Sequence, residues 1–438
     1  MNFRDTLKIE GNDLVIGGLT ASELRERFGT PLYVMDESYI REVSRSFQKT
    51  IEAFYGEGAV AFASKAFSAV AMYKIMNSEG LSIDVVSGGE LFAALRAGFP
   101  PERIYFHGNN KLFNEIEFAV LSGVGNIVID HPDEIEMISA AAKRLGKVQS
   151  VMLRINPGIE AHTYAAVQTA TPDSKFGWAI EDKNTVELIK RAAAAENLVF
   201  SGLHAHIGSQ IFEISGYEML IDKMTSFIVK LNGLGIDVKI LNLGGGFGIT
   251  YTEEDPEFSG DQYAWYVKTI AMFLSKAVVE KKIKRPFLVI EPGRSIVGEA
   301  GVTLYTVGAV KTIPDIRKYI AIDGGMFDNP RYALYGSKYS AIVANKAALP
   351  ASETVTICGK CCESGDIIAK DIKLAPAKRG DIIAVFATGA YNYTMAMNYN
   401  MNPIPPVVLV QDGKADYIVK PQTYEDLIRN NCLPDWLK

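Results

Sequence analysis

The sequence predicts an α/β protein: a (β/α)8 TIM-like barrel plus a C-terminal, mostly antiparallel β-barrel or sandwich domain that also collects the N-terminus. Three observations predict this fold. Short apolar strand candidates alternate with helical patterns between residues 59 and 290. Polar or glycine-rich tips follow many of those strands. After about Gly298 the alternation stops, and strand-like runs separated by turn signals replace it.

The strand candidates of the first region are short and rich in Val, Ile, Leu or Phe, which suits strands buried on both faces of a parallel sheet. The eight candidates are Ala59–Ala63, Leu81–Val86, Arg103–His107, Asn126–Asp130, Val148–Ile155, Leu198–His206, Val238–Leu243 and Pro286–Ile290. Seven of the eight are clearly followed by a helical pattern. A closed barrel is the simplest architecture for this count, and an open doubly wound sheet is the alternative.

The helical patterns carry start and stop signals. A helix of about residues 38–53 precedes the first strand, and a later one has Pro132 in its first turn and Lys143–Arg144 near its end, which matches the helix dipole. The segment Asn156–Gly177 is long for a strand-to-helix connection, so we expect a functional lid there.

The two ends of the chain have a different pattern. The first residues, LKIEGNDLVIGG, indicate a hairpin, and the runs after Gly298 indicate strands with turns such as Asp412-Gly413. The sequence therefore predicts a barrel over residues 37–297 and a β domain made of residues 1–36 and 298–438.

Composition excludes several functional classes. Of the 438 residues 48% are hydrophobic and 22% charged, and the net charge of −6 comes without a long basic run, so nucleic-acid binding is not expected. Neither a secretory signal nor an apolar run of membrane-spanning length is evident. Four cysteines are few for this length, and three lie within five residues of each other, which predicts a reducing, cytoplasmic location.

Three of the predicted strand ends suit a phosphate group. Gly244–Gly246 would let the backbone approach an anion closely, while Ser209 adds a hydroxyl and Arg294 a charge. A plain tight turn is the alternative for the glycine triplet. The triplet is not a dinucleotide fingerprint, because its third glycine would fall on Ile249, and HIGSQ lacks the closing glycine of a nucleophile elbow.

Three further strand-end residues complete a recognisable set. Lys65 ends the first strand, His206 could stack on a flat ring, and Glu291 could serve as a base, a salt-bridge partner or the partner of a cationic heterocycle. His204 shares a strand face with His206; a metal pair lacks a third ligand, and a buried, satisfied histidine is the preferred interpretation of His204. Amine, imidazole, carboxylate and phosphate cradle together predict pyridoxal 5'-phosphate.

The β domain adds a second group of reactive residues. The stretch CGKCCESGD invites a zinc interpretation, but it lacks a second cysteine pair and all five histidines lie before residue 207, so no metal is predicted. An ordinary thiol is mostly protonated at neutral pH, so Cys362 could donate a proton, and Glu363 could bind an ammonium. Arg331 and Tyr335 form a suitable pair for a carboxylate.

In these motifs the sequence resembles the alanine-racemase-fold, or fold type III, pyridoxal-phosphate-dependent decarboxylases over nearly the whole chain. The motifs that carry the resemblance are SKA at Ser64, SGGEL at Ser87, HGNNK at His107, SKFG at Ser174, HAHIGSQ, GGGFG, EPGR, CESGD at Cys362 and GAY at Gly389. Two departures stand beside motifs: family members often have glycine at the position of Asn392 and serine at that of Leu112.

The resemblance implies a role for each matching residue. Its catalytic positions are Lys65, which holds the cofactor, His206, which stacks on the ring, and Cys362, which donates a proton. Its cofactor-binding positions are Lys65, His206, Ser209, Gly245, Gly246, Glu291, Gly293, Arg294 and Tyr391. Its substrate-binding positions are Arg294, Arg331, Tyr335, Glu363 and Tyr391.

The activity that the resemblance implies is decarboxylation of meso-2,6-diaminopimelate to L-lysine, the last step of lysine biosynthesis. Ornithine, lysine or a carrier-bound amino acid are alternative substrates, although Arg331 would repel a distal ammonium. The family also implies a homodimer, in which Cys362 and Glu363 reach the partner's site. Two other classes are considered: a non-catalytic cofactor carrier, which would not need Cys362 and Glu363, and a nucleotide-dependent oxidoreductase, which would form no bond at Lys65.

Overall fold

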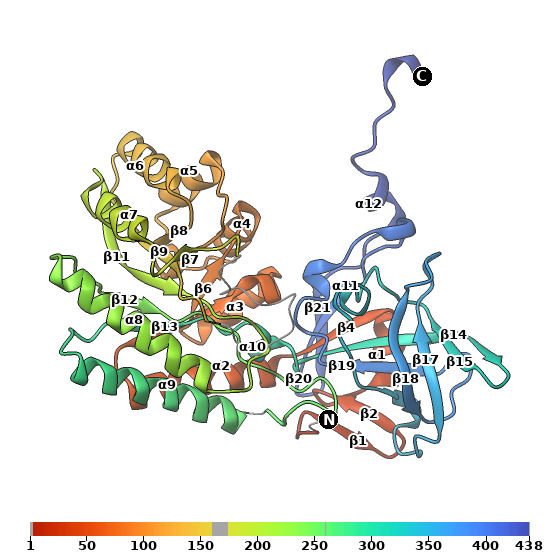
Figure 1. Cartoon of the computed structure of the whole chain (residues 1–438). Coiled ribbons are helices and arrows are strands. Elements are labelled where there is room, and N and C mark those ends of the chain that lie inside the picture. Colours follow the sequence, from red (N-terminus) through yellow and green to blue (C-terminus); the bar gives the residue numbers. More distant parts are fainter. Residues whose placement is uncertain (1–2, 160–173, 259, 438) are drawn as a thin grey trace. The chain divides into compact units, whose positions relative to one another are not determined.

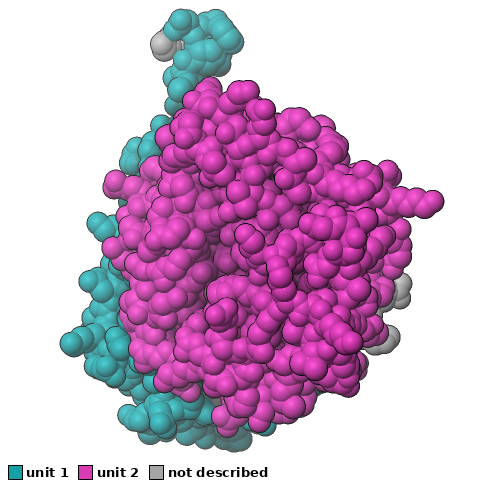
Figure 2. Space-filling view, turned by 90° about the vertical axis from the view of Figure 1, so that its left-hand side faces the viewer, with its two compact units in different colours: residues 1–40, 250–257, 297–438 teal, residues 41–249, 258–296 magenta. Residues whose placement is uncertain are grey.

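The computed structural model describes residues 3–159, 174–258 and 260–437. Contacts divide the chain into two compact units, which Figure 2 colours separately. The β unit comprises residues 1–40, 250–257 and 297–438, and the barrel unit comprises residues 41–249 and 258–296. Residues 250–257 therefore group with the β unit, although the chain on either side of them belongs to the barrel unit. Most of the predicted lid, Asn156–Gly177, lies outside the described residues.

The barrel unit is built on a closed ring of parallel strands (Figure 1). The order runs from β5 through β6, β7, β8, β9, β11 and β12 to β13, which pairs with β5. The predicted barrel is thus confirmed, and the open sheet is excluded. The strands are β5 Gly58–Ala63, β6 Ser82–Val85, β7 Ile104–Phe106, β8 Asn126–Ile129, β9 Gln149–Asn156, β11 Leu198–Ala205, β12 Ile240–Asn242 and β13 Phe287–Ile290.

The barrel strands form because their residues are apolar on both faces. Strands β6, β7 and β8 are buried along their whole length, as expected for a parallel sheet covered by helices. One buried cluster draws side chains from five of the strands, as in the packed interior of a (β/α)8 barrel. Its members are Ala61, Tyr105, Val128, Met152 and Val289.

A helix follows every barrel strand, including the eighth, where α10 is only four residues long. The extra strand β10, Trp178–Ala179, pairs in parallel with β9. Pro132 lies at the N-cap of α6, directly before the helix. The helices are α2 Glu37–Phe54, α3 Val70–Ser78, α4 Gly88–Arg96, α5 Phe113–Ser122, α6 Asp133–Leu145, α7 Lys183–Ala194, α8 Ser215–Gly233, α9 Gly260–Glu280 and α10 Arg294–Val297.

The β unit contains two sheets. A small one joins β1 Leu7–Glu10, β2 Asp13–Ile16 and β3 Leu19–Thr20, which confirms the N-terminal hairpin. The large one is mostly antiparallel, as predicted, with parallel pairing of β15 with β17 and of β4 with β20. Its strands are β4 Leu32–Asp36, β14 Gly301–Ile313, β15 Arg317–Ile322, β16 Ala341–Val343, β17 Glu353–Cys358, β18 Ile367–Leu374, β19 Ile382–Phe386, β20 Val407–Gln411 and β21 Lys414–Val419.

The remaining helices of the β unit are short. They are α1 Ala21–Phe28, α11 Arg331–Tyr335 and α12 Tyr424–Ile428. Across the described parts of the chain, no helix combines the length and apolar character needed to cross a membrane.

Candidate active site

Lys65 lies in a tight turn at the end of the first barrel strand. The turn, residues 64–66, follows β5, and the lysine side chain is exposed while its neighbours in the turn are buried. The Ser64 hydroxyl donates a hydrogen bond to the carbonyl of Asp84 on β6. A Cβ added to Gly293 would lie 2.9 Å from Ala63 Cβ, so the segment after β13 packs closely against this turn. These contacts fix the backbone of the turn from which the Lys65 side chain extends.

The turn after β12 requires glycine at the positions of the triplet, because of its backbone conformation and its close contacts. Gly246 has a φ of 110°, in the left-handed region that favours glycine. A Cβ on Gly245 would lie 2.0 Å from the Glu291 carbonyl oxygen, and one on Gly246 would lie 2.4 Å from the Gly208 carbonyl oxygen. The triplet therefore brings the ends of β11, β12 and β13 into direct backbone contact.

A serine and an arginine lie beside this turn. Arg294 opens α10, is buried, and donates from Nη2 to Ser209 Oγ at 3.0 Å. Ser209 follows Gly208, the residue against which Gly246 packs. A guanidinium, a hydroxyl and a side-chain-free turn together have the chemistry of a phosphate cradle.

His206 follows β11 and contacts the same turn. Its Nδ1 accepts a hydrogen bond from the Gly245 N–H at 3.2 Å. Burial, and then the charges of Lys65 and Arg154, lower the pKa of His206 well below its usual range. The ring is therefore neutral at physiological pH. His206 follows β11 as Lys65 follows β5, and the carboxyl ends of parallel strands lie at the same end of the barrel.

Glu291 is the centre of a buried polar cluster at the end of β13. Asn242 Nδ2 donates to its Oε1 at 2.6 Å, and His204 Nε2 lies 3.1 Å from Oε2. His107 Nε2 lies 2.8 Å from Oε1, in ion-pair range but without hydrogen-bond geometry. Burial opposes ionisation of this carboxyl, but His107 and His204 hold its pKa well below the usual range. Glu291 is therefore an ionised, buried carboxylate.

His204 differs from the expected satisfied histidine in one respect. Burial lowers its pKa to about 4, and its Nε2 contacts Glu291, but its Nδ1 has no hydrogen-bond partner in the described part of the chain. Ligand-type atoms of His107, His204 and Glu291 also lie within 4.8 Å of one another, a group that does not include His206 and so differs from the histidine pair considered from the sequence. The Asn242 donor on Oε1 favours a hydrogen-bonded carboxylate over a metal site.

Arg331 opens α11 in the β unit and is buried. Its Nη1 donates to the hydroxyls of Tyr251 at 2.8 Å and Tyr339 at 2.7 Å. Its guanidinium carbon lies 5.1 Å from the Tyr251 ring centroid. Tyr335, at the other end of α11, is exposed. The two residues predicted to act as a pair therefore differ in burial.

The turn of residues 359–366 carries Cys362 and Glu363, and both side chains are exposed. The buried carboxylate of Asp366 organises the turn by accepting from the Cys361 N–H at 2.7 Å and the Met326 N–H at 2.6 Å. Burial, followed by the charge of Asp366, raises the pKa of the Cys361 thiol to about 11. Cys362 is thus the accessible thiol of the pair.

The structure places the predicted site residues in two groups, each within its own unit. The barrel unit brings together Lys65, His206, Ser209, Gly245, Gly246, Glu291, Gly293 and Arg294. The β unit holds Arg331, Tyr335, Cys362, Glu363 and Tyr391, of which Tyr391 has a positive φ of 63°. Tyr391 directly precedes Asn392, whose Oδ1 accepts from the Tyr339 hydroxyl at 3.1 Å, which links Tyr391 to the surroundings of Arg331.

Several residues of these clusters were not predicted from the sequence. Asn242 and His107 both stand at predicted strand ends, so the rule that found Lys65 and Glu291 could have found them. Tyr251 and Tyr339 had no such signal, because their importance comes from a contact with Arg331 across 80 and 8 residues, respectively.

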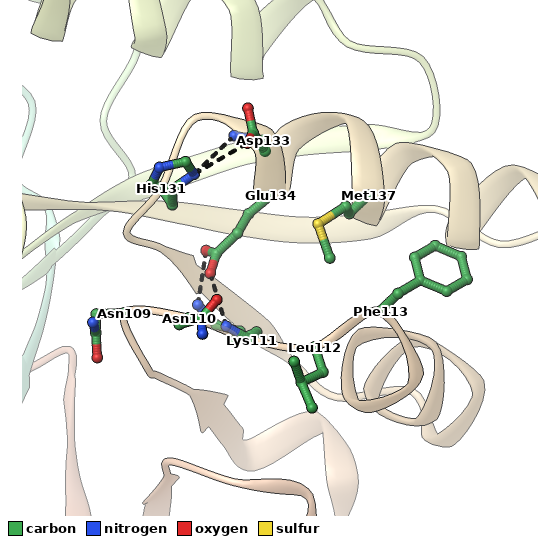
Figure 3. A pocket seen from close by; sticks show the side chains of 9 residues that line it. All are labelled: Asn109, Asn110, Lys111, Leu112, Phe113, His131, Asp133, Glu134 and Met137. Atoms are coloured by element: carbon green, nitrogen blue, oxygen red, sulfur yellow. Dashed lines mark hydrogen bonds and ion pairs between the residues drawn. The ribbon is translucent and has the colours of Figure 1, made fainter.

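A hollow of about 500 Å³ lies elsewhere on the barrel unit, between the connections that precede α5 and α6 (Figure 3). Its floor contains Lys111, whose Nζ lies 2.8 Å from Glu134 Oε2 and donates to the Gly108 carbonyl at 2.7 Å. Burial lowers the pKa of Lys111, and the buried Glu134 partner opposes that change. The lysine is thus engaged in joining two loops, and this hollow contains none of the predicted site residues.

Comparisons with known proteins agree with this geometry. Residues 40–298 match the family described as pyridoxal-dependent decarboxylase, pyridoxal binding domain. The chain is 46% identical to a diaminopimelate decarboxylase of Bacillus subtilis (strain 168), over 95% of this chain and 94% of the relative. The diaminopimelate decarboxylase of M. jannaschii in complex with L-lysine has a TM-score of 0.90 at 34% identity, covering 99% of both chains. That of Helicobacter pylori with L-lysine has a TM-score of 0.84 at 29% identity, covering 93% of this chain and 98% of that one.

Proposed function

The chain belongs to the family of pyridoxal-dependent decarboxylases, and from this premise we propose that it converts meso-2,6-diaminopimelate to L-lysine and carbon dioxide. Curated relatives that are 40% to 46% identical over nearly the whole chain are named for this activity. The observation that carries the substrate assignment is Arg331, a buried guanidinium without a carboxylate partner in the described residues.

The barrel residues fit the family's cofactor, pyridoxal 5'-phosphate. The glycine triplet packs against the backbone of the residue before Ser209, and the Ser209 hydroxyl accepts a hydrogen bond from Arg294. A glycine turn, a hydroxyl and a guanidinium that suit a phosphate therefore lie near one another. Glu291 is kept ionised, which suits a protonated ring nitrogen, and the neutral ring of His206 suits stacking on a flat heterocycle. Lys65 supplies the amine that would bond the aldehyde carbon.

The bound cofactor supplies an electron sink for the pair of electrons left when the carboxylate departs as carbon dioxide. Glu291 would hold a proton on the ring nitrogen of the bound cofactor, since His107 and His204 keep its carboxylate ionised. Ser209 and Arg294 would anchor the phosphate. A proton must then replace carbon dioxide on the same carbon, and the exposed Cys362 thiol is the proposed donor.

Recognition of the far end of the substrate is assigned to the β unit. Arg331 and Tyr335 would bind the distal carboxylate, and Glu363 the distal ammonium. A substrate with only a distal ammonium, such as ornithine or lysine, would leave the buried Arg331 without an anion and add a like charge beside it. This supports diaminopimelate over the diamine-forming decarboxylase substrates.

The enzyme is further proposed to be a homodimer in which Cys362 and Glu363 of the partner subunit complete each site. The exposure of both side chains on the turn of residues 359–366 supports this arrangement. Mixing a Lys65→Ala variant with a Cys362→Ser variant should restore activity in hybrid dimers, because one of the two sites in each hybrid then has both native residues. No recovery after subunit exchange would argue for complete sites within one chain.

All four cysteines are free, which suits a reducing cytoplasm.

The experiment that tests the proposed function is carbon dioxide release by the purified protein with added pyridoxal phosphate. We expect rapid release from meso-diaminopimelate and little from the LL isomer, ornithine or L-lysine. Preferred turnover of ornithine or lysine would reject the substrate assignment, and no turnover of any amino acid would reject the decarboxylase assignment.

A further inference from the structure

Among the described residues, the hydrogen bonds of the Arg331 guanidinium in the β unit all involve one of its three nitrogens. Nη1 donates to the hydroxyls of Tyr251 and Tyr339, at 2.8 Å and 2.7 Å. The two tyrosine rings meet edge to face, with centroids 5.4 Å apart and an interplanar angle of 89°. The guanidinium carbon lies 5.1 Å and 5.8 Å from the two ring centroids, within the range of cation–π attraction. The arginine is therefore held by neutral groups.

This arrangement leaves the other edge of the guanidinium for a ligand. Within the described residues, Nε and Nη2 of Arg331 have no hydrogen-bond partner, and no carboxylate forms an ion pair with the group. Nε and Nη2 lie on the same side of the planar fork and can bind both oxygens of one carboxylate. A charge that is only 7% exposed is costly without an anion, so the open edge is suited to a carboxylate ligand.

A third residue fixes the direction of the Tyr339 hydroxyl. That hydroxyl donates to Asn392 Oδ1 at 3.1 Å, so its lone pairs remain for Arg331 Nη1. Asn392 is fully buried, and its Nδ2 has no partner among the described residues. Burying an amide donor without a partner costs free energy, so the remaining hydrogen bond of Asn392 is the contact that its side chain contributes here. That contact orients the Tyr339 hydroxyl.

The segment that carries Tyr251 is fixed by backbone contacts. The Ser340 N–H and hydroxyl both donate to the Tyr251 carbonyl, at 3.2 Å and 2.9 Å. These bonds attach residues 250–257 to the residue that follows Tyr339, and explain why this segment groups with the β unit. The backbone beside each tyrosine is therefore held in place, and both hydroxyls accept hydrogen bonds from the same guanidinium.

We propose that Tyr339, Tyr251 and Asn392 are positioning residues that lock Nη1 of Arg331 and so present its Nε–Nη2 edge to the distal carboxylate of the substrate. This rests on the proposed function, because that function supplies the distal carboxylate. The three residues act through Arg331 on substrate selection and leave the reacting carbon untouched. Their loss weakens binding of ligands with a distal carboxylate and leaves other ligands unaffected.

The test compares Tyr339→Phe with Tyr417→Phe in the holoenzyme. Tyr417 is a matched control, since it is a partly exposed tyrosine of the β unit that makes a ring contact with Phe28 and no hydroxyl bond within the described residues. Tyr339→Phe should raise the KM for meso-diaminopimelate about tenfold, with kcat changed less than about twofold. The Kd for L-lysine, which retains this carboxylate, should rise equally in calorimetry. Turnover of D-lysine, which has the same reacting centre without the distal carboxylate, should not change.

Two further variants test the same role if Tyr339→Phe folds poorly. Tyr251→Phe should act like Tyr339→Phe, and Asn392→Ala should raise KM by a smaller factor of about threefold. In an Arg331→Ala background, Tyr339→Phe should have no additional effect, because the group it positions is gone.

The outcomes separate this proposal from the proposed function. If wild-type enzyme releases carbon dioxide from meso-diaminopimelate but Tyr339→Phe behaves like Tyr417→Phe, the positioning role is overturned and the function stands. If the wild type does not act on meso-diaminopimelate, the proposed function is wrong. The positioning role can then still be tested by L-lysine binding, and it is overturned if wild type and Tyr339→Phe bind L-lysine equally well. An equal loss on D-lysine would indicate general damage to the site and reject selective positioning.

Discussion

Glu291 of the barrel unit and Arg331 of the β unit are both buried charged groups, and each is 7% exposed. They are held differently. Asn242, His204 and His107 all approach the carboxylate of Glu291, on both of its oxygens. Arg331 is held through one nitrogen by two neutral hydroxyls, and its second edge has no partner within the described residues.

This difference indicates which kind of ligand each buried charge suits. Glu291 is kept ionised by its surroundings, which suits a permanently bound cationic ring whose proton must be retained. Arg331 is fixed in direction and left without an anion, which suits a ligand that arrives and leaves with its own carboxylate. Under the proposed function, the barrel unit would provide the reaction centre and the β unit would provide the selection of the substrate.

The largest expected effect tests the barrel half of this comparison. Lys65→Ala removes the amine at the end of β5 and should abolish turnover of every substrate, because the cofactor loses its attachment point. Borohydride treatment followed by peptide mapping should label Lys65 in the wild type. Lys74→Ala, an exposed lysine on the following helix, should keep full activity, and substantial turnover by Lys65→Ala would remove Lys65 from its proposed role.

The next effect concerns the charge of Glu291. Glu291→Gln keeps the shape of the side chain but cannot stabilise a proton on the ring nitrogen, so kcat should fall at least about 10²-fold with little change in KM. The chemical shift of ¹⁵N-labelled cofactor should move toward that of an unprotonated ring nitrogen. An unchanged shift would mean that another group holds this proton.

A smaller effect tests the turn of residues 359–366. Cys362→Ser replaces the exposed thiol, and kcat should fall about 10²-fold through loss of a proton donor. Cys361→Ser is the matched control, because the half-buried Cys361 has a pKa of about 11 and contacts Asp366. Equal losses in the two variants would point to damage to the turn instead of proton donation.

The smallest expected effect concerns pH. Burial lowers the pKa of His204 to about 4, below its value of about 6.5 in an unfolded chain. The unfolded state therefore binds more protons between these values, so the stabilising contribution is complete above about pH 6.5 and is lost as the pH falls toward 4. At about pH 4.5 it should be about 2 kcal/mol smaller than at pH 7.

Urea unfolding at the two pH values measures this contribution. His204→Gln should remove that part of the pH dependence, whereas His131→Gln, at an exposed histidine, should keep it. An identical pH dependence in wild type and His204→Gln would show that His204 is not buried in its neutral form.

The barrel could be predicted from sequence because its strands are buried on both faces and end in polar tips. The β unit was harder to predict. The charged residues Lys370, Asp371 and Lys373 interrupt the apolar pattern of the edge strand β18, since an edge strand can expose such side chains to water. The short β4 has only buried residues, but it stands alone between two helices and so has no neighbouring strand pattern in the sequence.

The site residues of the barrel unit were likewise easier to predict from sequence than those of the β unit. The positions of Lys65 and Glu291 could be predicted, because residues at the carboxyl ends of the strands of a parallel barrel converge on one face. The partners of Arg331 were not, because Tyr251 lies in a loop between two barrel elements and joins the β unit through tertiary contacts. The sequence pattern reports local periodicity, and a contact between residues 251 and 331 has no local signature.

The central claim is that a buried arginine selects a substrate with a distal carboxylate for a reaction centred in the barrel. The most direct measurement is the ratio of kcat/KM for meso-diaminopimelate to that for D-lysine, in wild type and in Arg331→Ala. We expect Arg331→Ala to lower this ratio about 10²-fold, because only one of the two substrates loses a charge-assisted contact. A ratio that is the same in both enzymes would contradict the account.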